Sequence, residues 1–221
     1  MISQRSAVLF SSLLNDSGFR HAFTTREEGD VDRLAEALRV PRARFYQAKQ
    51  VHGRNVVTAE GDYEALSRVE ADGLVAEPGS GAAVAVRVAD CVPVLLADRS
   101  TGRVAAVHAG WRGVEARIVD AALDRIDARA VVAAIGPCIN PCCFEVDADI
   151  AERLSHVVHR EDDKAFVDLR AAVRAQLVAR NVHNTSIDDV PGCTKHEPER
   201  FHSFRRDGAN SGRLFGAIVA R

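Results

Sequence analysis

The chain has 221 residues, 47% of them hydrophobic, and a formal net charge of −2 at pH 7. Nucleic-acid-binding proteins usually carry a basic excess, and a bilayer-spanning helix needs about 20 consecutive apolar residues; the sequence shows neither feature. We therefore expect no nucleic-acid partner and no membrane partner. The length is enough to bury a sizeable core, and we expect a single domain over residues 1–221.

The N-terminal segment Met1–Leu14 contains one arginine and a short apolar run. No small-x-small cleavage site follows, and Ser11 and Ser12 interrupt the apolar run, which argues against a signal peptide. We expect an ordinary strand or loop there. The five cysteines are scattered and odd in number, which favours reduced thiols over a disulfide framework. These features predict a cytoplasmic protein, and the even charge distribution favours a monomer.

The first part of the chain alternates short strands with one helix. Gly18–Arg26 is typical of a strand that leads into a loop at Glu27–Asp30. Asp30 can cap a helix over Val31–Leu38, which Pro41 ends. Further strands are predicted at Phe45–Val51, Asn55–Ala59 and Asp72–Ala76.

The most informative stretch is Ala83–Arg112. It contains three apolar strands, and a turn at Asp98–Gly102 separates the last two. Cys91 lies between the first two strands, and His108 lies where the third ends. Reactive side chains at strand ends are where a rigid sheet presents chemistry to solvent, so this segment is the predicted site. The predicted strands are Ala83–Val88, Val92–Ala97 and Val104–Val107.

In the second part, helical periodicity alternates with strands and ends in a polar loop. Many strands follow one another directly, which favours an α+β fold with a mixed sheet over a doubly wound parallel sheet. Helices are predicted at Val114–Ile126, Ala148–Val158 and Asp168–Arg180, strands at Val131–Ile135 and Leu214–Val219, and a loop at Pro191–Asp207.

Three potential metal ligands follow or precede predicted strands: His52, Cys91 and His108. Two imidazoles and a thiolate suit zinc and would leave a fourth position for water. Their spacing matches no zinc-finger pattern, and a single histidine or cysteine more often has a structural role. Cys91 and His108 could instead form a dyad in which the imidazole takes the thiol proton.

Three other cysteines, Cys138, Cys142 and Cys143, lie in the sequence GPCINPCCFEV. This C-x3-C-C spacing lacks the paired C-x2-C of structural zinc sites, and no second half is evident. We expect buried or loop thiols.

Arg205 and Arg206 lie in a polar loop before Asp207 and Gly208. Guanidinium groups bind phosphate well, but surface arginines paired with an aspartate are also common. Trp111, the only tryptophan, could stack on a planar ligand or pack in the core.

Taken together, the motifs resemble one known family over nearly the whole chain, in the family's order. The sequence resembles the multicopper polyphenol oxidase/laccase-domain family, which includes bacterial purine nucleoside phosphorylases and the peptidoglycan-editing factor. Glu27–Glu28–Gly29 departs from the glycine pair that relatives carry there. The matching segments are Phe23–Arg26, Gln50–Gly53, Ala89–Pro93, His108–Gly113, Gly136–Ile139, Cys193–Thr194 and Ser203–Gly208.

The resemblance implies that His52, Cys91 and His108 are metal ligands, with zinc the expected ion and copper less favoured. It also implies layered mixed β-sheets flanked by helices, similar to the catalytic domain of cytotoxic necrotizing factor. In that toxin the corresponding cysteine and histidine form a hydrolase dyad. The implied activities are phosphorolysis of adenosine, inosine, guanosine and methylthioadenosine, and deamination of adenosine. A role in peptidoglycan-precursor editing is also implied.

Our hypothesis from the sequence is a zinc-dependent purine nucleoside enzyme whose substrates are nucleosides and phosphate. Besides the metal ligands Cys91 and His108, Asp90 is a candidate catalytic residue, either as a proton shuttle or by orienting Cys91. Candidate substrate- and phosphate-binding residues are Arg26, Gln50, Trp111, Arg112, Arg205 and Arg206.

Three alternatives stay open. A Cys91–His108 hydrolase could act on an amide such as a serine-containing murein precursor. A non-catalytic binding module would keep its biological effect in His52→Ala. Copper polyphenol oxidation is the least favoured, because the chain has eight histidines and no His-x-His pair with which to hold several coppers.

Overall fold

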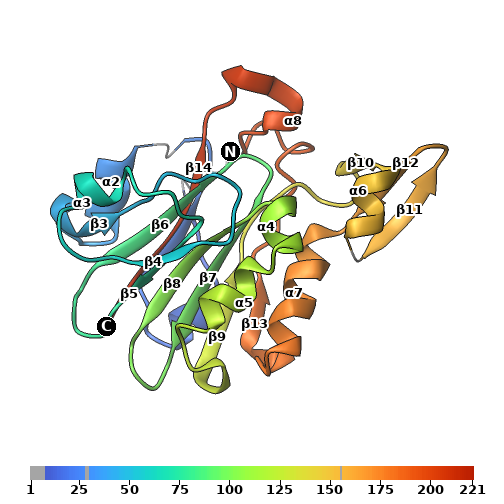
Figure 1. Ribbon diagram of the computed structural model, residues 1–221. Coiled ribbons are helices and arrows are strands. Elements are labelled where there is room, and N and C mark those ends of the chain that lie inside the picture. The colour runs from blue at the N-terminus through green and yellow to red at the C-terminus, as the bar shows by residue number, and fades with distance from the viewer. Residues whose placement is uncertain (1–7, 28–29, 155) are drawn as a thin grey trace, which may run out of the picture.

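Two stacked β-sheets lie at the centre of the computed structural model, which describes residues 8–27, 30–154 and 156–221 (Figure 1). The first sheet has five strands in the order β1-β2-β14-β6-β3, and the second has six in the order β13-β9-β7-β8-β5-β4. Both contain parallel and antiparallel neighbours. The strands of the first sheet are β1 (Val8–Leu9), β2 (His21–Thr24), β3 (Phe45–Tyr46), β6 (Ala83–Val88) and β14 (Leu214–Val219). Those of the second are β4 (Val56–Thr58), β5 (Gly73–Ala76), β7 (Val92–Asp98), β8 (Val104–Ala109), β9 (Val131–Ile135) and β13 (Ile187–Asp189).

Strand β7 shows why the apolar runs at the centre of the sequence are continuous rather than alternating. Val94 and Leu96 belong to the core on the helix-covered side of the six-stranded sheet. Leu95 and Ala97 face the core between the two sheets. Because both faces of the strand are covered, every residue of β7 is buried.

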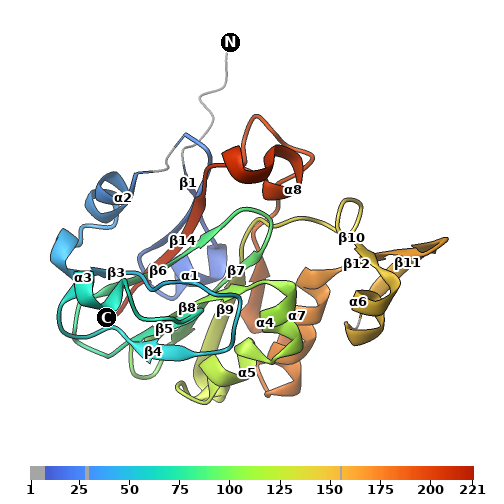
Figure 2. The same cartoon turned by 45° about the horizontal axis from the view of Figure 1, so that its top comes forward.

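Helices cover the outer faces of the two sheets (Figures 1 and 2). Leu34 and Ala35 of α2 pack with Phe215 against the five-stranded sheet, and Ile118 and Val173 lie in the core over the six-stranded sheet. The result is a layered α+β fold with mixed sheets flanked by helices, which confirms the predicted class. The helices that pack on the sheets are α2 (Val31–Ala37), α4 (Trp111–Glu115), α5 (Ile118–Leu123) and α7 (Leu169–Ala179).

A third, three-stranded sheet stands at one side of the molecule (Figure 1). The helix predicted over Ala148–Val158 is wrong in its second half: α6 (Ala148–Arg153) ends early and the chain enters β11 (Val157–Glu161). β-branched Val157 and Val158 favour a strand that pairs with its neighbour rather than another helical turn. The other strands of this sheet are β10 (Glu145–Asp147) and β12 (Lys164–Val167).

Two further expectations change in detail. Within Met1–Leu14, of which residues 1–7 lie outside the described chain, β1 is followed by the helix α1 (Ser12–Asp16). Ser11 caps α1 by accepting a hydrogen bond from Leu14 N, 3.3 Å away. The helix predicted over Val114–Ile126 begins at Trp111 and is broken at Arg117, whose φ of 65° is left-handed.

Several short elements were not predicted, and one predicted strand is shorter. Phe45–Val51 is a strand only over β3, which frees the following residues for a loop. Part of the predicted loop Glu27–Asp30 (residues 28 and 29) lies outside the described chain. In the described residues no helix is long and apolar enough to cross a membrane. The unpredicted elements are α3 (Tyr63–Leu66), α8 (Phe204–Asp207), β10, β11, β12, β13, and the 3-10 turns Arg42–Arg44, Ala128–Ala130, Asn184–Ser186 and Gly208–Asn210.

The buried histidine of β2 makes the stability of this fold pH-dependent. His21 Nδ1 donates to Phe19 O at 2.9 Å, so its Nε2 accepts the hydrogen bond from Ser11 N at 2.8 Å, and the ring is neutral. Burial lowers the pKa of His21 below its ordinary 6.5. The contribution of His21 to stability is therefore complete above pH 6.5 and is lost as the pH falls below that value.

We predict that the free energy of unfolding of the wild type falls more between pH 7.5 and pH 5.5 than that of His21→Gln, measured by urea titration at both values. Comparing the two proteins cancels the contributions of the other titrating groups. An equal fall in both would contradict the assignment of a neutral, buried His21.

Candidate active site

The antiparallel pair β7–β8 brings Cys91 and His108 together. Pro93 is opposite His108 and Val92 is opposite Ala109, so Cys91, directly before β7, lies beside the end of β8. The chain reaches Cys91 from β6 through a tight turn. The third predicted ligand, His52, comes from a loop between β3 and β4.

The three predicted metal ligands converge. One potential ligand atom from each of His52, Cys91 and His108 lies within 4.8 Å of the others. The two imidazole rings are 4.7 Å apart between centroids and inclined at 78°. His108 is buried, Cys91 is half-buried and His52 is exposed, so the cluster opens to solvent on one side. Two imidazoles and a thiol in this arrangement can hold a metal ion and leave a position for a further ligand.

Gly110 closes the protein side of this cluster. A Cβ atom on this residue would lie 3.0 Å from His52 Cδ2 and 3.1 Å from Cys91 Sγ. Only the absence of a side chain lets the backbone at the start of α4 approach the three ligands so closely. The backbone at Gly110 therefore fits closely against the His–Cys–His cluster.

Asp72 orients two of the ligands. Its buried carboxylate accepts a 2.7 Å hydrogen bond from His108 Nδ1, which leaves Nε2 of that ring as the nitrogen that can bind a metal. The same carboxylate accepts hydrogen bonds from the backbone N–H groups of Val51, His52 and Gly53 at 3.2, 2.9 and 2.7 Å. A carboxylate behind a metal-binding imidazole fixes its tautomer and raises its basicity.

The electrostatics of Cys91 and His108 favour an ion pair when no metal is bound. Burial opposes the thiolate, but the charge and hydrogen bonds of His108 and His52 outweigh burial and lower the pKa of Cys91 to about 6. Burial also opposes the imidazolium, but Cys91 and Asp72 raise the pKa of His108 to about 9. By contrast, burial raises the pKa of the Cys138 thiol to about 11. Cys91 therefore has the properties of a reactive or metal-binding thiol.

A cavity of 490 Å³ opens over this cluster. Its wall combines apolar and aromatic side chains with three arginines and the polar ligands. This composition is typical of a small-molecule site in which a few polar groups orient an apolar ligand. The residues that line it are Gln50, His52, Arg87, Val88, Ala89, Asp90, Cys91, His108, Ile139, Phe144, Phe204, Arg205 and Arg213.

Asp90 lies in the cavity wall, and hydrogen bonds occupy both its carboxylate oxygens. Oδ1 accepts from Thr194 Oγ1 and Oδ2 accepts from Arg205 N, each at 2.6 Å. The backbone of Asp90 has a φ of 93°, which is rare for a residue with a side chain. Asp90 therefore joins the segment before Cys91 to two loops of the C-terminal part of the chain.

The structure separates the predicted phosphate-binding arginines. Arg205 reaches the cavity, but Arg206 points into its own loop, where it donates to Asp207 and to backbone carbonyls of Thr194, Lys195 and Phe201.

The other two arginines also lie away from the cavity lining. Arg26 donates to Pro198 O, and the guanidinium of Arg112 stacks 4.3 Å from the ring centre of Trp111. Trp111 itself packs against the core beneath α4 and does not line the cavity. Gln50 does line it, although its amide is bound to the backbone of Arg87 through both polar atoms.

Sequence reasoning missed Asp72, Arg87 and Arg213. Nothing local marked Asp72, because an aspartate that bounds an apolar strand is a common turn residue. Arg87 is the single charged residue in the run AVAVRV, which marks it as a side chain that leaves the core. Nothing local distinguishes Arg213 from other surface arginines.

We predict that Asp72→Asn weakens metal binding at the His–Cys–His cluster by about 10- to 100-fold, because the amide holds His108 and the 51–53 loop less firmly. Zinc competition titrations with a chromophoric chelator measure this change. Asp98→Asn is the matched control: Asp98 is also buried and accepts several hydrogen bonds, but it closes the turn between β7 and β8 at the far end of the strands. Equal losses in the two variants would show that Asp72 acts only through general stability.

Comparisons with known proteins identify relatives of this chain. The chain is 36% identical over 209 residues to adenosine deaminase RL5 from an unknown prokaryotic organism, covering 85% of this chain and 79% of that protein. It is 33% identical over 211 residues to purine nucleoside phosphorylase YlmD from Geobacillus stearothermophilus, covering 86% and 77%.

The fold agrees as well. The crystal structure of YlmD from Geobacillus stearothermophilus superposes with a TM-score of 0.87 at 27% identity, covering 99% of this chain and 98% of that one. Residues 20–221 match the family model for multi-copper polyphenol oxidoreductase laccase. The chain therefore belongs to the multi-copper polyphenol oxidoreductase laccase family, together with relatives named as purine nucleoside phosphorylases and an adenosine deaminase.

Proposed function

We propose that this protein is a zinc-dependent purine nucleoside enzyme that phosphorolyses adenosine, inosine, guanosine and methylthioadenosine and deaminates adenosine. The observation that carries the proposal is the convergence of His52, Cys91 and His108 on the floor of a cavity whose walls combine apolar rings and arginines. The names of the relatives support the choice of substrate class. We also propose a cytoplasmic location, which is consistent with nucleoside and phosphate substrates.

The donor set supports zinc at this site. Two imidazoles and one thiolate are borderline ligands of the kind zinc binds, and Asp72 supplies the outer hydrogen bond that such histidines usually have. Zinc bound there would supply a Lewis acid beside the substrate. A four-copper oxidase would need further clusters of histidines, and the sequence has only eight histidines with no His-x-His pair.

The cavity walls suit the two substrates of phosphorolysis. This reaction joins phosphate to C1′ of the ribose while the bond from C1′ to the purine breaks, so the enzyme must hold an anion beside a planar base. Ile139, Phe144 and Phe204 offer apolar surface for the base. Arg205 and Arg213 at the same cavity are the candidates for phosphate, with Arg87 as a third cation.

We infer a positioning role for Asp90 rather than proton transfer, because both its oxygens accept hydrogen bonds from Thr194 and Arg205. In this role Asp90 holds the loop that carries Arg205 at the cavity.

A second candidate function rests on one specific observation: Cys91 interacts with His108, and His108 in turn donates a hydrogen bond to Asp72. A thiol with a pKa of about 6, an imidazole with a pKa of about 9 and a buried carboxylate behind the imidazole form the arrangement of a thiol hydrolase. Without metal, Cys91 could attack an amide such as a serine-containing murein precursor. Metal ligation and nucleophilic attack both need the same sulfur, so the two functions exclude each other in one molecule.

The nucleoside activity can be tested directly. Purified, metal-assayed protein is incubated with adenosine, with and without phosphate, and the products are separated by chromatography. Without phosphate we expect inosine alone; with phosphate we expect adenine as well, together with hypoxanthine from phosphorolysis of the inosine. All three products should be lost in His108→Ala. His159→Ala, which removes an exposed histidine of β11, is the matched control and should retain both activities. Zinc-loaded protein that yields none of these products would overturn the proposal for adenosine, and turnover that survives in His108→Ala would identify a contaminant.

Alkylation of Cys91 separates the metal enzyme from the thiol hydrolase. In metal-free protein, labelling by iodoacetamide should rise with pH around 6 and level off above pH 7, because the thiolate reacts and its pKa is about 6. Zinc should protect Cys91 at neutral and alkaline pH, where the ligands can stay deprotonated, as peptide mass spectrometry would show. If Cys91 is labelled equally fast in zinc-loaded protein, the sulfur is free and the hydrolase is the better account.

A further inference from the structure

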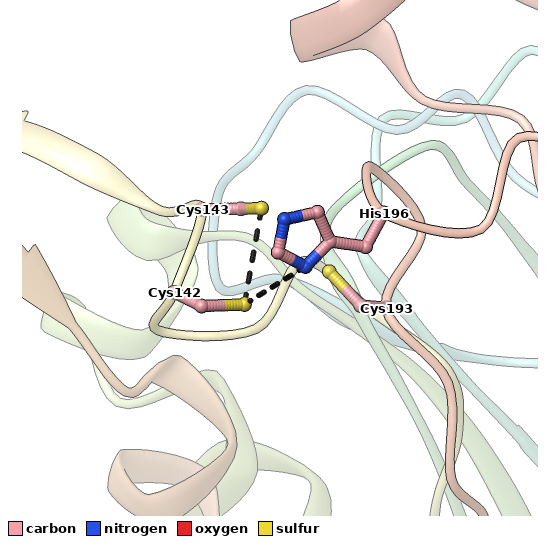
Figure 3. A group of neighbouring side chains, drawn as sticks. All are labelled: Cys142, Cys143, Cys193 and His196. Carbon is pink, nitrogen blue, oxygen red and sulfur yellow. Dashed lines mark hydrogen bonds between the residues drawn. The ribbon is translucent and has the colours of Figure 1, made fainter.

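A second group of cysteines and a histidine converges away from His52, Cys91 and His108. Potential ligand atoms of Cys142, Cys143, Cys193 and His196 all lie within 4.8 Å of one another. Figure 3 shows the four side chains pointing toward one another from two loops. One loop joins β9 to β10, and the other joins β13 to α8. From the sequence we expected buried or loop thiols here, because the second pair of ligands, Cys193 and His196, lies about fifty residues further along the chain.

We propose that these four residues form a structural zinc site with three thiolates and one imidazole. In a tetrahedral site with Zn–S bonds of about 2.3 Å, two sulfurs lie about 3.8 Å apart, and a sulfur and an imidazole nitrogen lie about 3.5 Å apart. Cys142 Sγ is 3.8 Å from Cys143 Sγ and 3.4 Å from His196 Nδ1. These separations are those of ligands on the edges of one tetrahedron.

The backbone holds both halves of the site in place. Asn140 O accepts hydrogen bonds from Cys143 N at 2.9 Å and Phe144 N at 3.0 Å, which forms the turn that carries the first two cysteines. Cys193 and His196 are three positions apart, so one turn can present both side chains to the same ion, and Glu197 N donates to Cys193 O at 3.0 Å, which closes this turn.

Two contacts join the halves directly. Thr194 N donates to Cys138 O at 3.0 Å, within a short parallel bridge between Cys138 and Cys193. Asn140 N donates to Cys193 Sγ at 3.5 Å, and such an N–H···S bond stabilises a zinc-bound thiolate. The ligands are therefore brought together by the protein backbone, and binding the ion requires little further ordering.

The arrangement fits a metal better than a disulfide. A disulfide needs two sulfurs at about 2.05 Å and gives no reason for a third thiol and an imidazole to face them. Cys142 and His196 are exposed, whereas Cys143 and Cys193 are buried, so an ion can enter from solvent and be enclosed by the inner pair. Four protein ligands leave no open position, which is the mark of a structural rather than a catalytic site.

The site would stabilise one wall of the cavity. Phe144, which lines the cavity, directly follows Cys143. Thr194, which donates to Asp90, directly follows Cys193. An ion that ties the two loops together holds both residues in place, although the proposal itself does not depend on which reaction the cavity supports.

Metal stoichiometry tests the proposal. Protein purified with zinc present and then desalted should contain two zinc ions per chain by atomic emission spectrometry. Cys142→Ser and His196→Ala, which change the exposed members, should each retain one. Cys138→Ser is the matched control, because it removes a neighbouring buried thiol outside the group and should retain two. His52→Ala should lose only the other ion, so failure of the first site and failure of the second are distinguishable.

Cobalt substitution identifies the ligands. Cobalt-loaded His52→Ala should show strong thiolate-to-cobalt charge transfer, which decreases in the double variant His52→Ala/Cys142→Ser. Wild-type protein with a single zinc that only His52→Ala removes would overturn the proposal. A disulfide between any two of Cys142, Cys143 and Cys193 in freshly purified protein would overturn it as well.

Discussion

The buried carboxylate of Asp72 connects two of the three segments that build the candidate active site, the loop that carries His52 and the end of β8 that carries His108. It accepts a hydrogen bond from His108 on β8 and from three consecutive backbone N–H groups in the loop that carries His52. Burial raises the pKa of Asp72, but the hydrogen bonds from His108 and Gly53 outweigh burial and hold the pKa below its usual value. A buried charge is tolerated only with such partners, so the loop and the imidazole must adopt these positions together.

The sheet supplies the rest of this geometry. Because β7 and β8 are buried on both faces, their register cannot slip without moving apolar side chains out of one core or the other. That register sets Cys91 beside His108, and Gly110 leaves room for both. The six-stranded sheet thus determines where Cys91 and His108 lie, whereas the surrounding loops form the cavity that leads to them.

Sequence reasoning succeeded where the chemistry is local and failed where it depends on distant contacts. The strands around Cys91 and His108 were predicted almost to their ends, since apolar runs and turn residues are local signals. The convergence of His52 with them came from resemblance, because no spacing rule joins a loop to two strands. Arg205 and Arg206 are neighbouring arginines that the sequence cannot tell apart. Only the fold shows that the Arg206 guanidinium donates its hydrogen bonds to Asp207 and to backbone carbonyls. The helix predicted to continue to Val158 failed because strand pairing outweighed helical periodicity.

Two different carboxylates hold the His–Cys–His cluster and the cavity wall in place. Asp72 fixes the His52 loop and His108, while Asp90 fixes Thr194 and Arg205. The positive φ of Asp90 costs conformational free energy that a glycine would not pay. A glycine at this position would, however, lose the two hydrogen bonds that the aspartate carboxylate accepts. Changes in the loops that carry Thr194 and Arg205 can therefore alter the cavity wall without removing the hydrogen bonds of Asp72 to His108 and the 51–53 loop. This separation gives a physical reason why one family can include relatives with names as different as adenosine deaminase RL5 and purine nucleoside phosphorylase YlmD.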